Sequence, residues 1–418
     1  MLLIATILRC PRGHPPGVEP DTPIPAQFEY VALLFALFVL PKVLQRYRIP
    51  SAITSFGLGA LSGMVLGRFQ GDGTLELLST FGIVALFLFA GLDVEFSRLR
   101  GQAGVLMQHL ALMLVALGLV AYGAATLLGL EPRVATLVSL ALLTPSTGFI
   151  LDSLHSLGVS PETRAWIKSK AIAAELVCLT ILFTTLRSTS TSNLLTATVA
   201  LVGLIVFLPL LFRAFAAFIV PHAPRSEFAF LMMTAVACGV ATYQLGVYYL
   251  VGAFVVGVAA QRLRAHIPTI ASENMLHAVE SFASLFVPFY FFVAGSRLRV
   301  EHFSVEALLA GVVLILVLAP LRIVMNWGHR RLALGESFRQ SLRVGAPLLP
   351  TLVFTLVIAE ILVDRFAVPA WLFGGLILYT VANSFLPAIL VGVRMPEEDE
   401  ELLNEPWLAG AENERHLP

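Results

Sequence analysis

Long runs of apolar residues, separated by short polar stretches, occupy this chain from about residue 28 to residue 393. A helix needs about 20 apolar residues to cross the hydrocarbon core of a bilayer, so each run near that length predicts one transmembrane helix. The pattern predicts an all-α polytopic membrane protein of about thirteen transmembrane helices. The predicted segments lie at 28–46, 50–67, 75–95, 103–129, 133–153, 166–187, 193–217, 227–244, 247–262, 274–296, 303–328, 340–363 and 369–393.

The composition agrees with a chain that faces a lipid bilayer. Of the 418 residues, 57% are hydrophobic and only 13% are charged, whereas soluble domains carry about 25% charged residues. The net charge is zero and the basic residues are spread along the chain, which argues against a nucleic-acid partner. The three cysteines form no CxxC motif, so no zinc site, disulfide framework or cofactor is expected.

The two ends of the chain differ from its apolar middle. Residues 1–27 hold a short apolar run followed by several prolines, and this run is too short to span a membrane. They predict a disordered external leader. Residues 396–418 begin with a cluster of acidic side chains and predict a short cytoplasmic tail. The membrane domain is therefore expected at 28–395.

The positions of lysine and arginine predict the orientation of the chain. If successive segments alternate in direction, sixteen basic residues fall in loops on one side and six in loops on the other. Basic residues favour cytoplasmic loops, so the N-terminus is predicted outside and the C-terminus in the cytoplasm, in the plasma (inner) membrane of a prokaryote. The richer side holds the basic residues at 42–48, 98–100, 164–170, 213–225, 262–264, 330–339 and 394, and the other side those at 68, 133, 187, 297–299 and 365.

Two of the predicted segments are interrupted near their middles. The fifth contains Thr-Pro-Ser-Thr-Gly at 144–148, and the twelfth contains Gly-Ala-Pro-Leu-Leu-Pro-Thr at 345–351. Proline removes a backbone hydrogen bond, and irregular backbone at membrane depth persists where it lines a cavity or is buried in protein. Ordinary proline kinks are the alternative, but interrupted helices in corresponding, opposite-running positions are typical of inverted-repeat transporters. We therefore expect two discontinuous, crossing helices, with Thr144, Ser146 and Thr147 beside an ion.

One carboxylate lies near the centre of a predicted helix. Glu175 is nine residues into the sixth segment, about 13 Å from its start at 1.5 Å per residue. An ionisable group at that depth indicates function, because burial favours the protonated form and a cation can displace the proton. The alternative is an idle glutamate that is bonded within the bundle. Glu280 is a weaker candidate, because His277 one turn earlier suggests an interfacial polar pair. The remaining carboxylates near segment ends are interpreted as interfacial or capping groups: Glu76, Asp93, Glu95, Asp152, Glu360 and Asp364.

Arg322 is the basic residue that lies well inside a predicted helix, the eleventh. Lys170 is expected at the cytoplasmic end of the sixth segment, and Arg330 at that of the eleventh. Glu175 and Arg322 would then lie at similar depth and approach each other. Snorkelling of Arg322 to the interface is the alternative.

Several stretches, taken in order, resemble one family. Residues 82–95, Gly-Ile-Val-Ala-Leu-Phe-Leu-Phe-Ala-Gly-Leu-Asp-Val-Glu, are similar to its third-span stretch ending in Gly-Leu-Glu. Residues 250–257, Leu-Val-Gly-Ala-Phe-Val-Val-Gly, resemble its Gly-Ala-Phe-x-Ala-Gly helix, and residues 280–295 its paired phenylalanines before Val-Gly. Residues 144–148 fall where that family has its first discontinuous helix. The chain thus resembles the cation:proton antiporter superfamily, nearest the branch of Kef-type potassium efflux and sodium/proton antiporters.

This resemblance implies a sodium/proton antiporter fold with alternating access and a homodimeric assembly. In it, Glu175 occupies the position of the family's ion-binding aspartate, and Arg322 that of the basic residue that pairs or competes with the site. The family's Asn, Gln or Asp before the acid is Ala174 here. The resemblance also implies a moving core and a dimerising scaffold, the core at 103–187 and 303–393 and the scaffold at 28–95 and 227–296.

The sequence thus predicts a secondary active transporter, not an enzyme, whose partners are a monovalent cation and protons. It would exchange Na+ or K+ for H+ electroneutrally, with Glu175 protonated and bound to the cation in turn. Two alternatives stay open: a transporter of the same fold that carries an organic anion paired with Arg322, and a non-transporting receptor or assembly subunit. The interrupted segments favour a transporter over the last of these.

Overall fold

The computed structural model describes residues 26–47, 49–94, 101, 103–154, 160–188, 190–223, 226–246, 248–263 and 272–391, and in these ranges the chain is helical without a β-strand. The N-terminal half comprises α2 (Ala26–Gln45), α3 (Ser51–Leu61) with a π-helical turn η1 (Ser62–Leu66), α4 (Gly73–Leu92), α6 (Ala103–Leu127), α7 (Pro132–Leu143), α8 (Thr147–Leu154), α9 (Pro161–Arg187) and α10 (Thr191–Phe218). The C-terminal half comprises α11 (Glu227–Gln244), α12 (Tyr249–Leu263), α13 (Glu273–Ser296), the 3₁₀ turn η2 (Val300–His302), α14 (Val305–Leu334), α15 (Phe338–Gly345), the 3₁₀ turn η3 (Ala346–Leu348), α16 (Leu352–Phe366) and α17 (Ala370–Val391).

The helices coincide with the predicted apolar segments, either singly or as a pair separated by an interruption. By length and composition, nine helices of the described ranges are able to cross a membrane, or ten if α15 and α16, bent by 43° at their break, form one span. Two predicted segments correspond to the shorter apolar helices Ser51–Leu66 and Tyr249–Leu263. The all-α membrane fold is confirmed, and the figure of about thirteen spans stays a prediction.

Polar residues at the helix starts explain several of the observed boundaries. Asp72 precedes α4 and its carboxylate accepts a hydrogen bond from the backbone N–H of Leu75 at 2.9 Å. Ser160 precedes α9 and accepts from the N–H of Thr163 at 3.2 Å, with Pro161 in the first helical position. These side chains bind backbone donors that the first helical turn leaves without a partner.

The N-cap at Ser160 corrects one boundary. α9 begins five residues before the predicted start at 166. Lys170, expected at the end of the segment, instead lies nine residues into α9 and is fully buried. That prediction is wrong, because a Ser-Pro start signal outweighed the polar composition of the first turns. The predicted leader before Ala26 and the acidic tail lie outside the described residues, as do Glu95 and the side chain of Asp152.

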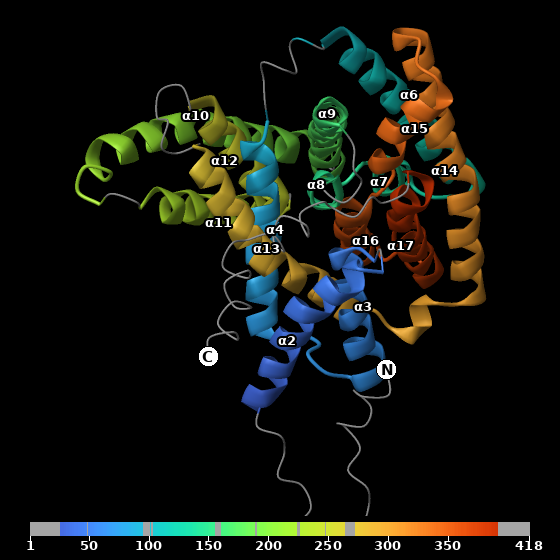
Figure 1. Ribbon diagram of the computed structural model, residues 1–418, viewed down its shortest axis with the longest axis horizontal. Helices are drawn as coiled ribbons and strands as arrows, with labels where there is room; N and C mark the ends of the chain where they lie inside the picture. Colours follow the sequence, from blue (N-terminus) through green and yellow to red (C-terminus); the bar gives the residue numbers. More distant parts are fainter. Residues whose placement is uncertain are drawn as a thin grey trace, which may run out of the picture.

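The helices pack in two groups, and Figure 1 shows α11 and α12 of the first at the left and α6, α7, α14, α16 and α17 of the second at the right. In one group, α4 packs against α12 and α13, α13 packs against α3, and α11 packs against α12. Glycine allows the close approach of α4 and α12, because a Cβ on Gly91 would overlap the carbonyl of Phe254, and one on Gly257 the carbonyl of Leu88. These glycines belong to the two stretches that resemble the antiporter family.

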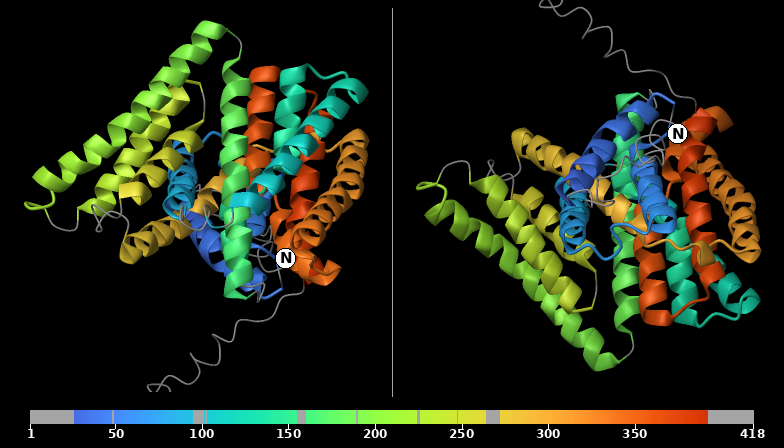
Figure 2. Two further views of the ribbon diagram at one scale, coloured as in Figure 1. Left: turned by 90° about the horizontal axis from the view of Figure 1, so that it is seen from above. Right: turned by 90° about the horizontal axis from the view of Figure 1, so that it is seen from below.

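In the other group, α14 packs against α17, α7 against α6 and α16, and α16 against α17. α9 contacts α6, α7 and α8 of this group as well as α10, and Figure 2 shows it standing between α10 on one side and α16 and α17 on the other. α10 is exposed along most of its length, since only 11% of the residues in its most apolar stretch are buried. Such exposure is expected of a helix that faces lipid.

Both predicted interruptions are present. α7 ends at Leu143 and α8 begins at Thr147, with three non-helical residues between them. α15 ends at Gly345 and passes through η3 before α16 begins at Leu352. The prediction of two discontinuous helices is confirmed.

Candidate functional site

The two interruptions contact each other directly. The backbone N–H of Ser146, between α7 and α8, donates to the carbonyl of Pro350, between α15 and α16, at 2.9 Å. The Ser146 hydroxyl accepts from the N–H of Val353 at 3.4 Å, and the Thr355 hydroxyl donates to the carbonyl of Ala141 at 2.7 Å. The two discontinuous helices therefore cross at their breaks, and polar groups released by one break are bound by the other.

Arg322 of α14 binds main-chain carbonyls at both breaks. Its guanidinium donates to the carbonyls of Leu349 at 2.6 Å, Leu348 at 2.7 Å and Leu142 at 3.4 Å. The side chain is 9% exposed. A guanidinium presents several donors in a fixed planar arrangement, and here it satisfies carbonyls that helical bonding no longer reaches.

Two residues of α17 complete this network. The Tyr379 hydroxyl donates to the carbonyl of Leu142 at 2.8 Å and accepts from Arg322 at 3.3 Å. The Asn383 amide donates to the carbonyl of Leu349. Both side chains are fully buried, so the crossing is held by hydrogen bonds in a medium where unpaired polar groups are costly.

Glu175 is buried beside the crossing without a basic partner. Its side chain is 2% exposed and Oε2 has no hydrogen-bond partner. Thr147, at the first position of α8, lies close enough to act on the carboxyl group, and its hydroxyl has no hydrogen-bond partner. No lysine or arginine among the described residues forms an ion pair with Glu175. Such a carboxyl is able to hold either a proton or a cation.

The structure brings together some of the predicted site residues and separates others. Thr147 faces Glu175, and Ser146 takes part in the crossing itself. Thr144 donates to the carbonyl of Leu140 within its own helix at 2.6 Å. Arg322 binds carbonyls instead of Glu175 in this conformation, so an Arg322–Glu175 contact is not observed. The roles of these residues in ion binding stay predictions.

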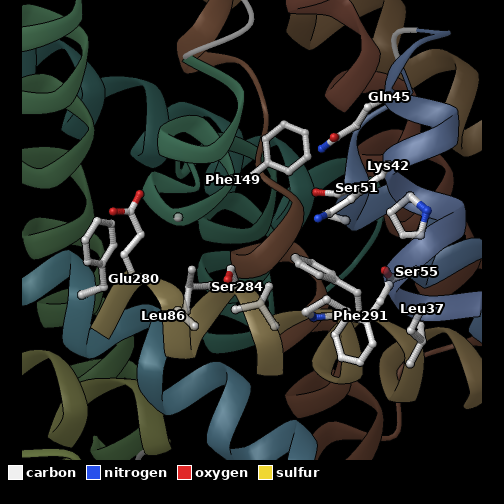
Figure 3. A pocket seen from close by; sticks show the side chains of 18 of the residues that line it. Leu37, Lys42, Gln45, Ser51, Ser55, Leu86, Phe149, Glu280, Ser284 and Phe291 are labelled. Atoms are coloured by element: carbon white, nitrogen blue, oxygen red, sulfur yellow. The ribbon is translucent and has the colours of Figure 1, made fainter. Parts of the chain in front are cut away.

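A large cavity of about 620 Å³ lies between the two groups of helices. Figure 3 shows Glu280 and Ser284 of α13 on one side and Lys42, Gln45 and other residues of α2 and α3 on the opposite side. Phe149 of α8 projects between them (Figure 3). The cavity is thus bounded by α13 on one side and by α2 and α3 on the opposite side, with α8 between them.

The lining of the large cavity includes the residue that follows Thr147. This residue is Gly148, and Thr147 itself acts on Glu175. Lys168 of α9 also lines the cavity and forms an ion pair with Asp93 at the end of α4. Asp93 was expected to be an interfacial group, and this contact shows that it links α4 to α9.

A second cavity, which we name the tyrosine cavity, has a volume of about 290 Å³ and lies at the opposite ends of α4 and α13. Residues 76–83 of α4 and 290–297 of α13 line the tyrosine cavity, whereas residues 86–93 and 276–291 of the same helices line the large cavity, and no residue lines both. The two cavities are therefore separate and lie toward opposite faces. The aromatic lining of the tyrosine cavity comprises Tyr243, Tyr248, Tyr249 and Tyr290.

The tyrosine cavity is crossed by an ion pair between the two groups of helices. Arg297 at the end of α13 pairs with Glu360 of α16, and Glu76 of α4 lies 3.4 Å from the same guanidinium. The Tyr248 hydroxyl donates to Glu360 at 2.8 Å. Glu360 was interpreted as an interfacial or capping group, and this interpretation missed both partners, which lie far away in sequence.

Other sequence predictions are tested by single contacts. The predicted polar pair of His277 and Glu280 is confirmed, since Nδ1 of the histidine lies 3.4 Å from the carboxylate. Lys170, Tyr379 and Asn383 were missed. The Ser-Pro pair at the start of α9 could have predicted that Lys170 lies well inside the helix. Tyr379 and Asn383 lie in an apolar segment of α17, and its pattern does not show which face contacts the two breaks.

Comparison with known proteins shows to which family a chain with this geometry belongs. The family description "Sodium/hydrogen exchanger, transmembrane" matches residues 32–392. A curated relative, the probable Na(+)/H(+) antiporter 3 of Methanocaldococcus jannaschii, is 25% identical over 291 residues, which is 66% of this chain and 72% of the relative.

Solved structures show the same fold. The sodium proton antiporter MjNhaP1 of M. jannaschii at pH 8 matches with a TM-score of 0.66 at 16% identity, covering 88% of this chain and 97% of that one. A second structure of MjNhaP1, determined by electron microscopy, matches with a TM-score of 0.63 at 16% identity, covering 89% and 96%. With a family match across nearly all of its helices, the chain belongs to the transmembrane sodium/hydrogen exchangers, a family of multi-pass membrane transporters.

Proposed function

We propose that the protein exchanges a monovalent cation, Na+ or K+, for H+, with Glu175 as the group that carries the two in turn. The observation that supports this most directly is the Glu175 carboxyl group, which is buried without a basic partner beside the start of α8. A deprotonated carboxylate in this position is costly unless an ion compensates it. Proton and cation therefore compete for one site.

The cation would reach Glu175 through the large cavity. Gly148, which follows Thr147 in α8, is one of the residues that line this cavity. The N-terminal end of α8 favours negative charge, which would stabilise the ionised carboxylate, while the hydroxyls of Ser146 and Thr147 would offer oxygen ligands. Under the predicted orientation, the large cavity opens to the cytoplasm of a prokaryotic cell.

The two cavities support an alternating-access mechanism. The large cavity and the tyrosine cavity lie toward opposite faces, between the same two groups of helices. We assign the group with α6 to α9 and α14 to α17 to a moving core, and the group with α2 to α4 and α11 to α13 to a scaffold that forms a homodimer. Movement of the core would close one cavity and open the other.

Exchange of one proton for one monovalent cation would be electroneutral. Arg322 keeps its charge at any physiological pH and therefore contributes no transported proton. Its donors are occupied by the carbonyls of Leu142, Leu348 and Leu349. This occupancy argues against the alternative in which Arg322 binds an organic anion.

The test is transport in proteoliposomes that contain a pH-sensitive dye. Sodium, potassium and lithium gradients are imposed in turn, and cation-dependent proton movement is expected in the wild type but not in Glu175→Gln. Glu227→Gln is the matched control, because Glu227 is also buried but lies in the first turn of α11, and it should keep transport. Undiminished exchange in Glu175→Gln would refute the proposal, and a rate that changes with an imposed potential would refute electroneutrality.

A further inference from the structure

Asp93 is a buried carboxylate in the lining of the large cavity. It directly follows α4, and its side chain is 10% exposed. One of its oxygens, Oδ1, forms an ion pair with the ammonium group of Lys168 in α9. The other oxygen, Oδ2, has no hydrogen-bond partner among the described residues. A buried carboxylate oxygen without a partner is costly, so Oδ2 is available to a further ligand.

Asp93 lies on the face of α4 that leads toward the exchange site. Leu86 lies seven residues earlier and also lines the large cavity, and residues seven apart share one face of a helix. The Leu86 side chain lies against Gly148 of α8, since a Cβ on this glycine would overlap it. Gly148 follows Thr147, which acts on the Glu175 carboxyl group. The face of α4 that carries Asp93 therefore extends to the start of α8, beside the exchange site.

Lys168 has the corresponding position on α9. It lies seven residues before Glu175, which is nearly two full turns, so the two side chains share one face of this helix. The rise between them is about 10.5 Å. The ion pair of Lys168 with Asp93 therefore lies along the same helix face as the exchange site, about two turns closer to the beginning of α9.

The Lys168 ammonium interacts with a second carboxylate. Glu280 of α13 acts on its charge and lines the same cavity. The Glu280 side chain is 51% exposed, and Nδ1 of His277 lies 3.4 Å from it. When His277 is neutral, Asp93 and Glu280 contribute two negative charges and Lys168 contributes one positive charge. One monovalent cation would therefore bring these groups to neutrality.

The other basic side chains in the lining are less buried than Asp93. Lys42 of α2 is exposed, and Figure 3 shows it on the side opposite Glu280. Arg164 of α9 is half-buried. Solvent screens charges in such positions. The Lys168 ammonium, which contacts the carboxylate directly, is therefore the main competitor of a cation at Asp93.

We propose that Asp93 is an outer binding site for the transported cation, which is held there before it reaches Glu175. The incoming Na+ or K+ binds Oδ2 of Asp93 and repels the ammonium of Lys168, which turns to Glu280. Two carboxylates then face two positive charges. Lys168 is a competitor attached to the protein and sets the affinity of the outer site. The inference rests on the proposed function of Glu175 and extends it to the route of the cation.

The experiment measures how fast the Lys168 amine is methylated, because an ammonium held by Asp93 should react more slowly than one released into the cavity. The chain contains three lysines, at 42, 168 and 170, so mass spectrometry can resolve the rate at each. The purified protein is treated with formaldehyde and a sodium-free amine–borane reductant, first in choline chloride and then in sodium or potassium chloride. The transported cation should raise the rate at Lys168 severalfold, up to a plateau, and leave the rate at the exposed Lys42 constant.

Substitutions assign this response to Asp93. In Asp93→Asn, Lys168 should react fast in choline chloride and show no dependence on sodium or potassium. Asp364→Asn is the matched control, because this exposed carboxylate lines the tyrosine cavity, and it should keep the response. If Asp93→Asn fails to fold, Lys168→Gln gives a second measurement. Its KM for a cation that enters from the large cavity should fall severalfold because the competitor is gone, and an unchanged or higher KM would overturn the inference.

The response in Glu175→Gln separates this inference from the proposed function. The outer site does not need Glu175, so the cation should still speed up the methylation of Lys168 in this variant. A rate at Lys168 that neither sodium nor potassium changes, or a response that disappears in Glu175→Gln, would overturn the role of Asp93. Cation–proton exchange that persists in Glu175→Gln would overturn the proposed function instead, whatever the methylation rates are.

Discussion

The backbone N–H of Ser146 donates to the carbonyl of Pro350 at 2.9 Å, so two breaks about two hundred residues apart in sequence are joined by a main-chain hydrogen bond. Each break exposes polar backbone groups that neither lipid nor a regular helix would bind. At the crossing, each break supplies partners for the other, and Arg322 binds the carbonyls that remain. The irregular backbone at the crossing is therefore stabilised by the two breaks themselves and by Arg322.

Arg322→Lys should destabilise the protein although it keeps the positive charge. A lysine has a single ammonium group and is not able to reproduce the bonds to Leu348, Leu349 and Leu142. A buried carbonyl left without a partner costs about 1–3 kcal/mol, so a fall in Tm of several degrees is expected for the purified protein. Transport should fall as well, because the crossing loses its geometry.

The control for this substitution is Arg331→Lys, at the exposed end of α14, which should leave the Tm unchanged. An Arg322→Lys variant as stable as the wild type would indicate that the guanidinium moves away from the carbonyls. Snorkelling to the interface would then be the better description of Arg322.

Much of this architecture follows from local sequence patterns. Apolar runs of about 20 residues predict helices because each must bury its own backbone groups in lipid. Prolines at 145, 347 and 350 predict the breaks because proline removes a helical hydrogen bond. Glu175 could be identified from the sequence because a single carboxylate within an apolar run is unusual by itself, whatever its contacts in the folded protein.

The contacts of the site could not be predicted in the same way. Arg322 donates to the Tyr379 hydroxyl and to main-chain carbonyls, and the carbonyls carry no residue-specific signal in the sequence. The pairing of Arg297 with Glu360 joins two helices whose registers are fixed only when the bundle packs. Lys170 lies in a stretch whose polar residues are typical of a helix end. It is buried because α14 packs next to it, where Asn326 accepts a hydrogen bond from its ammonium group.

The orientation of the chain is testable at two exposed positions. Val300, between α13 and α14, lies on the side that is poor in basic residues, and Leu332, near the end of α14, lies on the basic side. In a background with Cys10 replaced by serine, Val300→Cys should react with a membrane-impermeant thiol reagent in intact cells and Leu332→Cys should not. Lysed cells, in which both should react, are the control. Reversed labelling would contradict the predicted N-out, C-in topology.

The ion pair between Arg297 and Glu360 suggests which contact must break when the tyrosine cavity opens. It joins α13 to α16 across this cavity, and the Tyr248 hydroxyl donates to the same carboxylate. If the two groups of helices move against each other, Glu360→Gln removes the charge that holds them together at this face. The conformation with an open tyrosine cavity should then become more populated, since losing a charged hydrogen bond changes such a balance by about 1–3 kcal/mol.

Accessibility of single cysteines measures this shift. A cysteine at Ser79, which lines the tyrosine cavity, should react severalfold faster with a small thiol reagent in Glu360→Gln, while one at Ser284, in the large cavity, should react more slowly. Glu76→Gln is the matched control. The Glu76 carboxylate contacts the same guanidinium at 3.4 Å but is about half exposed, and exposed ion pairs contribute little. Opposite changes at the two cysteines require coupled cavities, because a local loosening at Glu360 would speed the reaction at Ser79 alone. Unchanged rates at both positions would mean that this ion pair does not hold the two groups of helices together.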